Sequence, residues 1–522
     1  MANKNLFQTL RGALMPAANA VNEAGGKAYA LTAKQALAQY AATGCLNGTF
    51  YASADEQLET VLRFCAEVET DFIAKTAVWC REAGFMKDMP ALLCAVLAAR
   101  DVALLEAIFP RVIDNGKMLR NFAQIMRSGV TGRKSFGTAV KRMMQRWLEA
   151  RTDAALLSDA VGQSPSLADI IRMVHPRPAN GERAALYAYL VGAPYDVAKL
   201  PALVRQYEAF KRGETLEVPD VSFQLLTALP LSASDWTAIA RNAPWQMTRM
   251  NLNTFARQGV FANEEVTLKI ALRLADPVAI AKARVFPYQL LSAYAAAGET
   301  VPQIVRDALQ DAMEVAIANV PATEGQVYVC PDVSGSMDSP VTGHRSGATT
   351  SARCIDVAAL VSAAIMRRNP SAVVLPFETK VVQVALNARD SVMTNAAKLA
   401  AVGGGGTNCS APLALLNARR AKGDLVIFVS DNESWADPQH GRGTAMMHEW
   451  AAFKQRNPKA RLICIDLQPY GTVQAQERND VLNIGGFSDA VFTLLADFAA
   501  GRMNDDHWTG IIESLAIARS AA

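Results

Sequence analysis

The sequence QVYVCPDVSGSM, residues 326–337, joins a short apolar run to a cluster of small oxygen-bearing side chains. The run around Val329 is apolar without alternation, which is typical of a parallel strand buried on both faces, and Pro331 ends it. The side chains that follow, in the spacing D-x-S-x-S, are Asp332, Ser334 and Ser336. Three oxygen-bearing side chains after one strand indicate a site for a hard cation such as Mg²⁺, which takes six oxygen ligands and keeps several waters.

The residues after this turn alternate between helical and strand-like patterns. Helices are expected over 351–368 and 390–401, and strands over 371–377, 381–386, 424–430 and 461–467. Such alternation predicts a Rossmann-like α/β domain built on a parallel sheet.

Two later segments supply further oxygens. Four consecutive glycines, 403–406, precede Thr407, and Asp431 follows the expected strand 424–430. Because loops at the carboxyl ends of parallel strands share one edge of the sheet, we expect these side chains to meet the first three. The predicted ligands of Mg²⁺ or another divalent cation are Asp332, Ser334, Ser336, Thr407 and Asp431. A turn that caps a helix without metal is the alternative.

This pattern resembles the von Willebrand factor A domain and its metal-ion-dependent adhesion site. The resemblance implies that Ser334, Ser336 and Thr407 lie at or near the cation, whereas Asp332 and Asp431 act largely through water. In such sites a carboxylate from a partner typically fills the remaining position. The metal would therefore hold a partner and would not serve as a Lewis acid.

Length and composition limit the number of domains and indicate the charge of a partner. The 522 residues suffice for at least two domains, and 51% apolar residues suffice for their cores. The net charge of +3 is nearly neutral but uneven, because residues 1–320 hold 34 Lys and Arg against 30 Asp and Glu, a net of +4. The first part of the chain is therefore where an anionic partner would bind.

None of the eight cysteines stands in a C-x-x-C spacing, so we expect reduced core residues in a cytosolic protein and no zinc site. The N-terminus lacks an uninterrupted apolar segment, and no stretch approaches the roughly 18 apolar residues that span a bilayer. We therefore expect a soluble, cytoplasmic protein without a membrane partner.

Residues 31–320 read as one amphipathic helix after another, with short loops and no convincing strand. Clear examples are expected over 58–69, 71–83, 89–100, 102–109, 117–128, 137–150 and 167–173. Consecutive amphipathic helices of this length predict an α-solenoid of stacked helix pairs, which offers a concave binding surface.

Positive charge is concentrated within this helical part. Residues 111–146 contain nine Lys and Arg against Asp114 alone, interleaved with Phe122 and Phe136 and followed by Trp147. Such a stretch indicates phosphate binding, with aromatic rings that could stack on unpaired bases. The alternative is a solvated helix face whose aromatic residues belong to the core.

Several segments of the helical part resemble one family. They are GCLNGTFY (44–51), AVWCREAGFMKDMPALLCAVLA (77–98), SLADIIRMVHPRP (166–178), WQMTRMNLNTFARQGVF (245–261) and KARVFPYQLLSAY (282–294). They look like the TROVE module of the Ro autoantigen ribonucleoprotein family, and the order of the two parts is similar to that of a bacterial member.

The resemblance implies a multidomain protein. Residues 1–320 would form an all-α ring of HEAT-like repeats, and residues 321–522 the α/β von Willebrand factor A domain that closes it. A basic hole would accept single-stranded 3′ ends of misfolded noncoding RNAs, and an outer surface would bind Y-like RNA. The resemblance further implies a monomer within a cytoplasmic ribonucleoprotein and, in bacteria, association with polynucleotide phosphorylase.

His175 corresponds to a histidine that faces RNA in that family, and Arg172 would share its helix face. A histidine that satisfies carbonyls at a helix end is the alternative. The chain departs from the pattern where relatives carry two basic residues, because it has Ser158 and Gly162 there. The predicted RNA-binding residues are Arg120, Arg127, Arg133, Lys134, Lys141, Arg142, Arg146, Arg172 and His175, with Arg249 and Arg284 as further candidates.

Signals for catalysis are weak. No phosphate-binding G-x-x-x-x-G-K-[ST] motif is present, and none of the five histidines stands beside a carboxylate at catalytic spacing. We therefore predict a non-catalytic RNA-binding scaffold that acts in RNA quality control. The alternatives are a metal-dependent nuclease and an A-domain adaptor for an ATPase chaperone.

Overall fold

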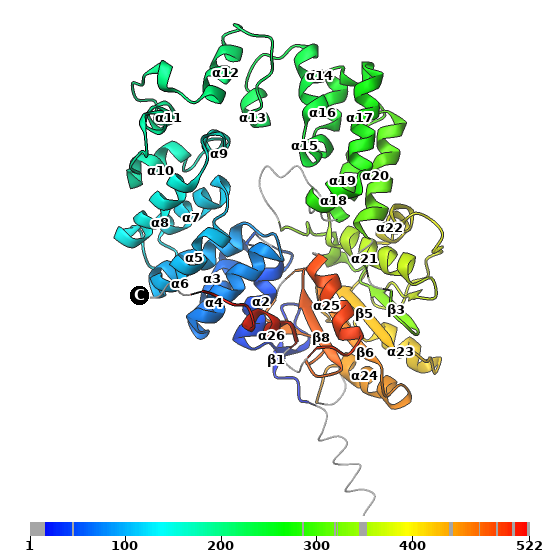
Figure 1. The fold of residues 1–522 in the computed structure, drawn as a ribbon. Helices are drawn as coiled ribbons and strands as arrows, with labels where there is room; N and C mark the ends of the chain where they lie inside the picture. Colours follow the sequence, from blue (N-terminus) through cyan, green and yellow to red (C-terminus); the bar gives the residue numbers. More distant parts are fainter. Residues whose placement is uncertain are drawn as a thin grey trace, which may run out of the picture. The chain divides into compact units, whose positions relative to one another are not determined.

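The structure is a computed structural model, and its described residues fold into two compact units (Figure 1). It describes residues 16–43, 46–47, 49–283, 287–317, 320, 322–343, 352–437, 442–468, 470–486, 489–503 and 507–518. The first unit draws on Met1–Val68, Phe286–Ser292 and Met313–Leu515, and the second on Glu69–Val285, Ala293–Ala312 and Ala516–Ala522.

Helices and loops make up the described part of the second unit. Its helices are α4 (Thr70–Glu82), α5 (Asp88–Arg100), α6 (Val102–Val112), α7 (Gly116–Ser128), α8 (Gly137–Ala150), α9 (Asp153–Asp159), α10 (Leu167–Val174), α11 (Gly181–Val191), η1 (Val197–Lys199), α12 (Ala202–Lys211), α13 (Phe223–Leu226), α14 (Ala233–Asn242), α15 (Trp245–Met250), α16 (Leu252–Arg257), η2 (Val260–Ala262), α17 (Glu264–Ala275) and α18 (Pro277–Ala283). Helices α19 (Pro287–Ala296) and α20 (Gln303–Ala316) contribute residues to both units.

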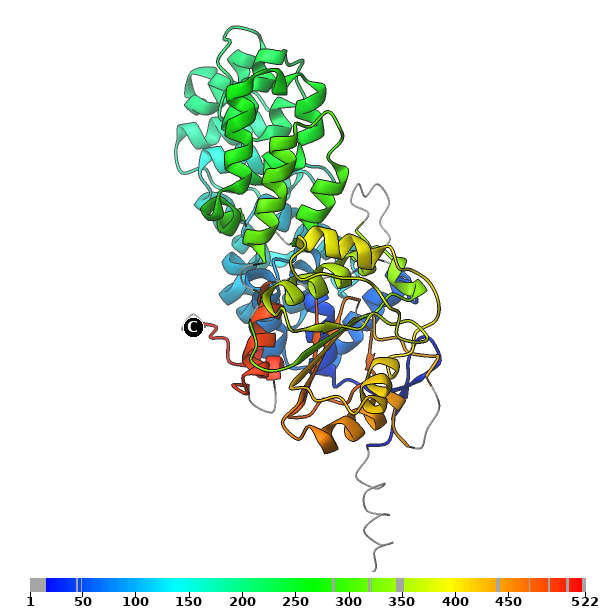
Figure 2. The same cartoon turned by 90° about the vertical axis from the view of Figure 1, so that its right-hand side faces the viewer.

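These helices stack in the manner of a solenoid (Figure 1 and Figure 2). Helix α4 packs against α5 and α6, α5 against α7, and α6 against α8, so each helix meets its second successor along the chain. This pattern confirms the predicted stack of helices. The predicted helices over 117–128 and 137–150 are confirmed as α7 and α8.

The first unit is built on a five-stranded parallel sheet with the order β4-β3-β5-β6-β8. The strands are β3 (Val327–Pro331), β4 (Val373–Val374), β5 (Leu425–Ser430), β6 (Arg461–Asp466) and β8 (Val481–Gly485). The helices around it are α21 (Cys354–Arg368), α22 (Val392–Ala400), α23 (Ala411–Ala418), α24 (Ala445–Arg456), α25 (Asp489–Ala499) and α26 (His507–Glu513). The predicted α/β fold is therefore confirmed.

Both faces of the sheet are covered. One hydrophobic cluster joins alternate strand residues to α23 and α24: Tyr328, Cys330, Val426, Phe428, Leu462, Cys464, Leu413, Leu416, Trp450 and Phe453. The intervening strand residues point to the opposite face, where α21 packs on β3 and β5. Burial on both faces explains why these strands read as continuous apolar runs in the sequence.

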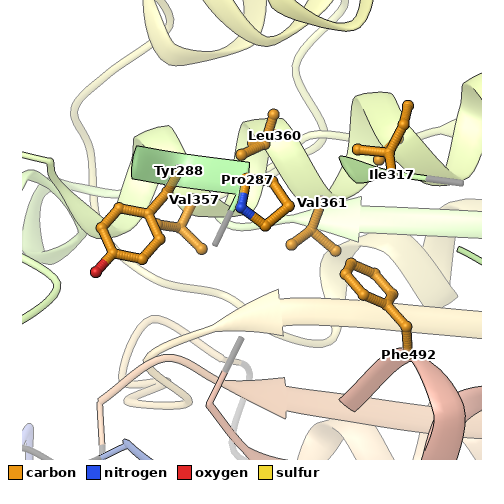
Figure 3. Close-up of a pocket in the computed structure, with 8 residues that line it drawn as sticks. Pro287, Tyr288, Ile317, Val357, Leu360, Val361 and Phe492 are labelled. Atoms are coloured by element: carbon orange, nitrogen blue, oxygen red, sulfur yellow. The ribbon is translucent and has the colours of Figure 1, made fainter. Parts of the chain in front are cut away.

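A small apolar pocket lies among the helices of this second face (Figure 3). Its lining comes from α19, α21, α25 and Ile317, and Figure 3 shows Phe492 reaching toward Val361. The space is small, and apolar side chains line it on every side that the structure describes. The pocket is therefore a gap in core packing.

One predicted strand is wrong and another is shorter than predicted. Residues 381–386 form no strand, because Val381 makes only an isolated bridge to Phe377. The expected strand over 371–377 is reduced to β4, the edge strand of the sheet. Among the strands that the structure describes, none lies beyond β4 to pair with these residues, so their apolar pattern does not become regular structure.

The described residues between 16 and 68 belong to the sheet unit and not to the helical unit, so the division of the chain differs from the predicted boundary between 320 and 321. Strand β1 (Ala20–Val21) pairs with β2 (Lys27–Ala30), which pairs with β7 (Thr472–Val473). Helix α2 (Ala33–Thr43) packs against β8, and α3 (Ala54–Glu67) packs against α2. The physical reason is hydrogen bonding and burial: Gln39 Nε2 donates to Asp466 Oδ2 at 2.6 Å, within the core.

The seven described cysteines are buried, as predicted for core residues, and Cys45 lies outside the described residues. Among the helices that the structure describes, none is both long enough and apolar enough to cross a membrane.

We predict that Gly486→Ala destabilises the sheet unit through α2. Gly486 has φ +93°, and a Cβ there would lie 2.8 Å from the Ala42 carbonyl oxygen of α2. The strained φ and the clash together should lower the free energy of unfolding by about 2 to 4 kcal/mol in chemical denaturation.

Gly25→Ala is the matched control, because Gly25 has φ +85° and nothing within 4 Å of the added Cβ. It should cost only the backbone term, about 1 to 2 kcal/mol. Equal losses in the two variants would show that α2 does not pack tightly on this turn.

Candidate metal centre and nucleic-acid interface

The five predicted metal ligands lie together at the carboxyl edge of the sheet. Asp332 follows β3 directly, and Ser334 and Ser336 belong to the turn that contains η3 (Gly335–Asp338). Thr407 lies in the loop between α22 and α23, and Asp431 follows β5. All five side chains are 5% exposed or less. The structure therefore brings these five residues together.

The three hydroxyls form a compact group. Thr407 Oγ1 donates to Ser334 Oγ at 3.0 Å, and Ser334 Oγ lies 3.3 Å from Ser336 Oγ. Adjacent oxygens around an octahedral Mg²⁺ are separated by roughly 3 Å, because each lies about 2.1 Å from the ion. The spacing of the hydroxyls thus fits a small divalent cation.

The two aspartates behave differently. Asp332 is anchored, because its carboxylate accepts from the Ser334 backbone N–H at 2.9 Å and from Ser430 Oγ at 2.6 Å. Asp431 Oδ2 is buried and has no hydrogen-bond partner among the described residues. A buried carboxylate oxygen without a donor is costly, and a cation at this edge would satisfy it. The donor set therefore fits the metal that the sequence predicts.

Negative charge is crowded at this edge. Burial and then the charge of Asp431 raise the pKa of Asp332, and burial raises the pKa of Asp431. Burial and Asp431 also raise the pKa of Glu433 to about 9. Burial raises the pKa of Asp466 well above its ordinary range. The folded protein therefore favours protonated carboxyls here unless a cation is bound.

The glycine loop brings Thr407 close to the first turn. Gly405 has φ +81°, and its carbonyl accepts from the Gly335 N–H at 3.1 Å. A Cβ at Gly405 would collide with the carboxylate of Glu378. Glycine is required at this position for both reasons.

The predicted RNA-binding residues of the helical unit fall into three groups. Arg120 and Arg133 are structural: Arg120 Nη1 donates to the Asp159 carbonyl at 2.6 Å, and Arg133 donates to the carbonyls of Ala98, Ser135 and Phe136. These hydrogen bonds satisfy backbone acceptors, so Arg120 and Arg133 are engaged inside the fold.

Arg146 and Arg172 form the second group, because both are exposed but already have acidic neighbours. Arg146 Nη2 lies 2.5 Å from Glu106 Oε1, and Arg172 Nη1 lies 3.3 Å from Asp169 Oδ1. Exposed ion pairs of this kind are weak, so either arginine can exchange its partner for a phosphate.

The third group is exposed and has no side-chain hydrogen bond or ion pair within the part of the chain that the structure describes. Its members are Arg127, Lys134, Lys141, Arg142 and His175. His175 lies beside α8, because Gln145 Nε2 of this helix donates to the His175 carbonyl at 3.3 Å and to the Val174 carbonyl at 2.5 Å. Lys141 and Arg142 precede Gln145 by four and three residues, so they neighbour it on α8.

His175 ends helix α10 in the left-handed conformation, with φ +51°, and its N–H donates to the Ile171 carbonyl at 2.9 Å. The backbone therefore fills the helix-capping role that the sequence offered as an alternative, while the imidazole stays exposed. A contact between this ring and RNA stays a prediction.

The predicted stacking role of the interleaved aromatic residues is wrong. Phe122, Phe136 and Trp147 are buried, and the Trp147 indole N–H donates to the Ile113 carbonyl. They pack the core between helices. Of the two further candidates, Arg249 donates to Gln246 Oε1, and Arg284 lies outside the described residues.

Two family models match the chain. The TROVE domain matches residues 167–365, and the Ro60 vWA domain, the family's von Willebrand factor A domain, matches residues 326–499. A curated relative from Deinococcus radiodurans, named RNA-binding protein RO60, is 26% identical over 92% of this chain and 95% of its own length. The chain belongs to the Ro60 family.

Two further comparisons have lower sequence identity. The RNA-binding protein RO60 of Caenorhabditis elegans is 24% identical over 49% of this chain and 40% of its own length. The crystal structure of the Deinococcus radiodurans RO (RSR) protein shares the fold, with a TM-score of 0.62 and 22% identity over 90% of this chain and all of that chain.

Sequence reasoning missed two residues of this Ro60-family metal edge. Tyr51 lies near Ser336, and burial and the charge of Asp431 raise its pKa. Glu433 is fully buried, and its Oε1 has no partner among the described residues. Glu433 stands two residues after Asp431, so its position in the sequence could have identified it as part of the metal edge. Nothing in the local sequence connects Tyr51 to residues 332–336.

We predict that the metal edge responds to pH and divalent ions together. A carboxyl whose folded pKa is raised contributes stability at low pH, which is lost as the pH rises through that pKa. Without divalent ions, the midpoint of thermal unfolding should therefore fall as the pH rises above the ordinary carboxyl range of about 4. Asp431→Asn should reduce this fall, because it removes one buried charge.

Added Mg²⁺ should raise the wild-type midpoint of thermal unfolding at neutral pH. At an Mg²⁺ concentration one hundred times its dissociation constant, the free energy of unfolding should increase by about 2.7 kcal/mol. Asp431→Asn should lose most of this response. Asp338→Asn is the matched control, because Asp338 lies in the same turn but pairs with Arg353. An equal Mg²⁺ response in the wild type and in Asp431→Asn would contradict the site.

Proposed function

We propose that the protein is a non-catalytic RNA-binding scaffold that holds single-stranded ends of misfolded or damaged noncoding RNAs and Y-like RNA. The observation that carries the proposal is the group of exposed cationic side chains on α8, Lys141 and Arg142, beside His175. The names of the two curated relatives, RNA-binding protein RO60, support the same conclusion.

The chemistry of this group suits a polyanion. Lys141 and Arg142 have no acidic partner among the described residues, so phosphates can bind them without breaking an ion pair. Arg146 adds a third charge one turn further along α8. Contacts of this kind release counterions and carry little sequence information, which is appropriate for a protein that accepts many RNAs.

The sheet unit supplies a second function in this proposal. Ser334, Ser336 and Thr407 hold Mg²⁺ or a similar cation, with Asp332 and Asp431 behind them, and the cation recruits a protein. Polynucleotide phosphorylase would join the assembly through the RNA. We further propose that the scaffold is a monomeric, cytoplasmic ribonucleoprotein component of RNA quality control.

The RNA function is tested by replacing Lys141, Arg142 and Arg146 together with Ala. Affinity for a hairpin with a single-stranded 3′ tail should fall roughly ten-fold or more in a filter-binding titration. The slope of log affinity against log salt should also decrease by about 2, because up to three phosphate contacts are lost.

A triple variant of Arg419, Arg420 and Lys422 is the matched control. These side chains lie in an exposed segment before β5, and the variant changes the net charge by the same amount. It should bind RNA as the wild type does. Equal RNA affinity of the wild type and both variants would show that Lys141, Arg142 and Arg146 do not bind the RNA.

The absence of catalysis is tested with the same RNA. Excess protein and Mg²⁺ should leave the RNA at full length on a denaturing gel over a time in which binding is complete. Shortened products that disappear with Asp431→Asn would support a metal-dependent nuclease instead, because such an enzyme needs the cation to activate water.

A further inference from the structure

Two exposed aromatic side chains lie beside the candidate metal centre and are not part of its ligand set. Trp435 is 53% exposed and Phe50 is 55% exposed. Both belong to the sheet unit, although they are almost 400 residues apart in the sequence. Large aromatic residues near the centre of a binding site often supply much of the affinity for a protein partner.

Trp435 lies on the Thr407 side of the centre. The backbone N–H of Trp435 donates to the Thr407 carbonyl at 3.1 Å. A Cβ added to Gly406 would lie 2.6 Å from Cζ2 of the indole, so the ring rests on the backbone just before Thr407. The indole therefore borders the hydroxyl group that would contact the cation.

Phe50 lies on the Ser336 side. Its ring packs edge-on against Tyr51, with 4.7 Å between the ring centroids. Tyr51 in turn lies near Ser336 and near the carboxylate of Asp431. The rings of Phe50 and Trp435 thus border the candidate ligands from two segments of the chain, and we call them the aromatic rim.

Charge favours one kind of occupant. The carboxylate of Glu378 lies against Gly405, and Asp437 accepts from Ser434 and Ser410 beside the same loop. Arg353, the basic residue that pairs with Asp338, is also occupied by Asp356. Acidic surroundings repel a chain of phosphates, whereas a single carboxylate bound to the cation adds only one charge.

The burial of the candidate ligands also favours a carboxylate side chain as the occupant. The ligand side chains are 5% exposed or less, so only a narrow, protruding group can reach the cation. An Asp or Glu side chain is such a group. The exposed indole beside it offers an apolar contact to the next residue of the same partner.

We propose that the aromatic rim and the cation together bind a protein partner, through an Asp or Glu side chain with a large apolar residue beside it. The inference rests on the proposed metal function. It adds the partner's second element, the apolar residue, and assigns its recognition to Trp435 and Phe50.

The test uses the full chain with fluorotryptophan, and the fluorine NMR signal of Trp435 is assigned by its loss in Trp435→Phe. The probes are capped peptides of the sequences Ala-Asp-Phe-Ala, Ala-Asp-Ala-Ala and Ala-Asn-Phe-Ala, and an oligouridylate. Ala-Asp-Phe-Ala should shift the Trp435 signal with Mg²⁺ and not with a chelator. It should bind roughly ten-fold tighter than Ala-Asp-Ala-Ala, and Ala-Asn-Phe-Ala should not bind.

Trp435→Ala should weaken binding of Ala-Asp-Phe-Ala roughly ten-fold while calorimetry gives wild-type Mg²⁺ binding. Val373→Ala is the matched control, because Val373 is an exposed apolar residue on the edge strand β4. It should change neither measurement.

Four results would overturn the inference. They are no shift at millimolar peptide, equal affinity for the two Asp peptides, wild-type peptide affinity in Trp435→Ala, and an Mg²⁺-dependent shift caused by the oligouridylate. Calorimetry separates the two proposals: if Mg²⁺ binds and the peptides do not, only the aromatic rim fails. If Mg²⁺ itself does not bind, both fail.

Discussion

Buried negative charge at the carboxyl edge of the sheet is the constraint on which the sheet unit depends. Asp332, Asp431 and Asp466 are buried there, and none of them forms an ion pair within the described residues. The parallel topology imposes this crowding, because β3, β5 and β6 all end at the same edge. Hydrogen bonds from Ser430 and from the Ser334 N–H offset part of the desolvation of Asp332. The orphaned Asp431 Oδ2 shows that the compensation is incomplete, and a divalent cation would complete it.

The same edge explains why the N-terminal residues belong to the sheet unit. Gln39 donates to Asp466 across a sequence separation of 427 residues, and β2 pairs with β7. Closing so long a loop adds little entropy cost beyond that of a moderately long one, since the cost grows only with the logarithm of length. Along the chain, most of the helical unit, Glu69–Val285, thus lies between two parts of the sheet unit. Substitutions in α2 that disturb Gln39 should therefore change the protonation of Asp466, which lies two strands from Asp332.

Local patterns made most of the sheet unit and its ligands predictable. The apolar runs, the D-x-S-x-S turn, the glycine loop before Thr407 and Asp431 after β5 are each readable within a few residues, and parallel topology supplies the convergence. Short non-local pairings were not readable. Strands β1 and β2 have two and four residues, and nothing in them specifies β7 as a neighbour. Tyr51 was missed for the same reason, and residues 381–386 were assigned to a strand because an apolar pattern does not reveal whether a neighbouring strand exists.

The number of basic residues in the helical unit overestimates the number of cations that are free to face solvent. A cluster of nine basic residues in 36 positions does not distinguish a cation that faces solvent from one that satisfies a helix end, because the unpaired carbonyls at those ends are known only once the helices are packed. Arg120 and Arg133 are used in this second way, and Phe122 and Trp147 are buried in the core, where they are not available for stacking. What remains exposed is a smaller set of cations, Lys141 and Arg142 among them, that have no acidic partner in the described part of the chain. The acidic metal edge carries the opposite charge. The proposed RNA site and the proposed cation site therefore differ in charge, and RNA and a carboxylate-bearing protein would not compete for the same residues.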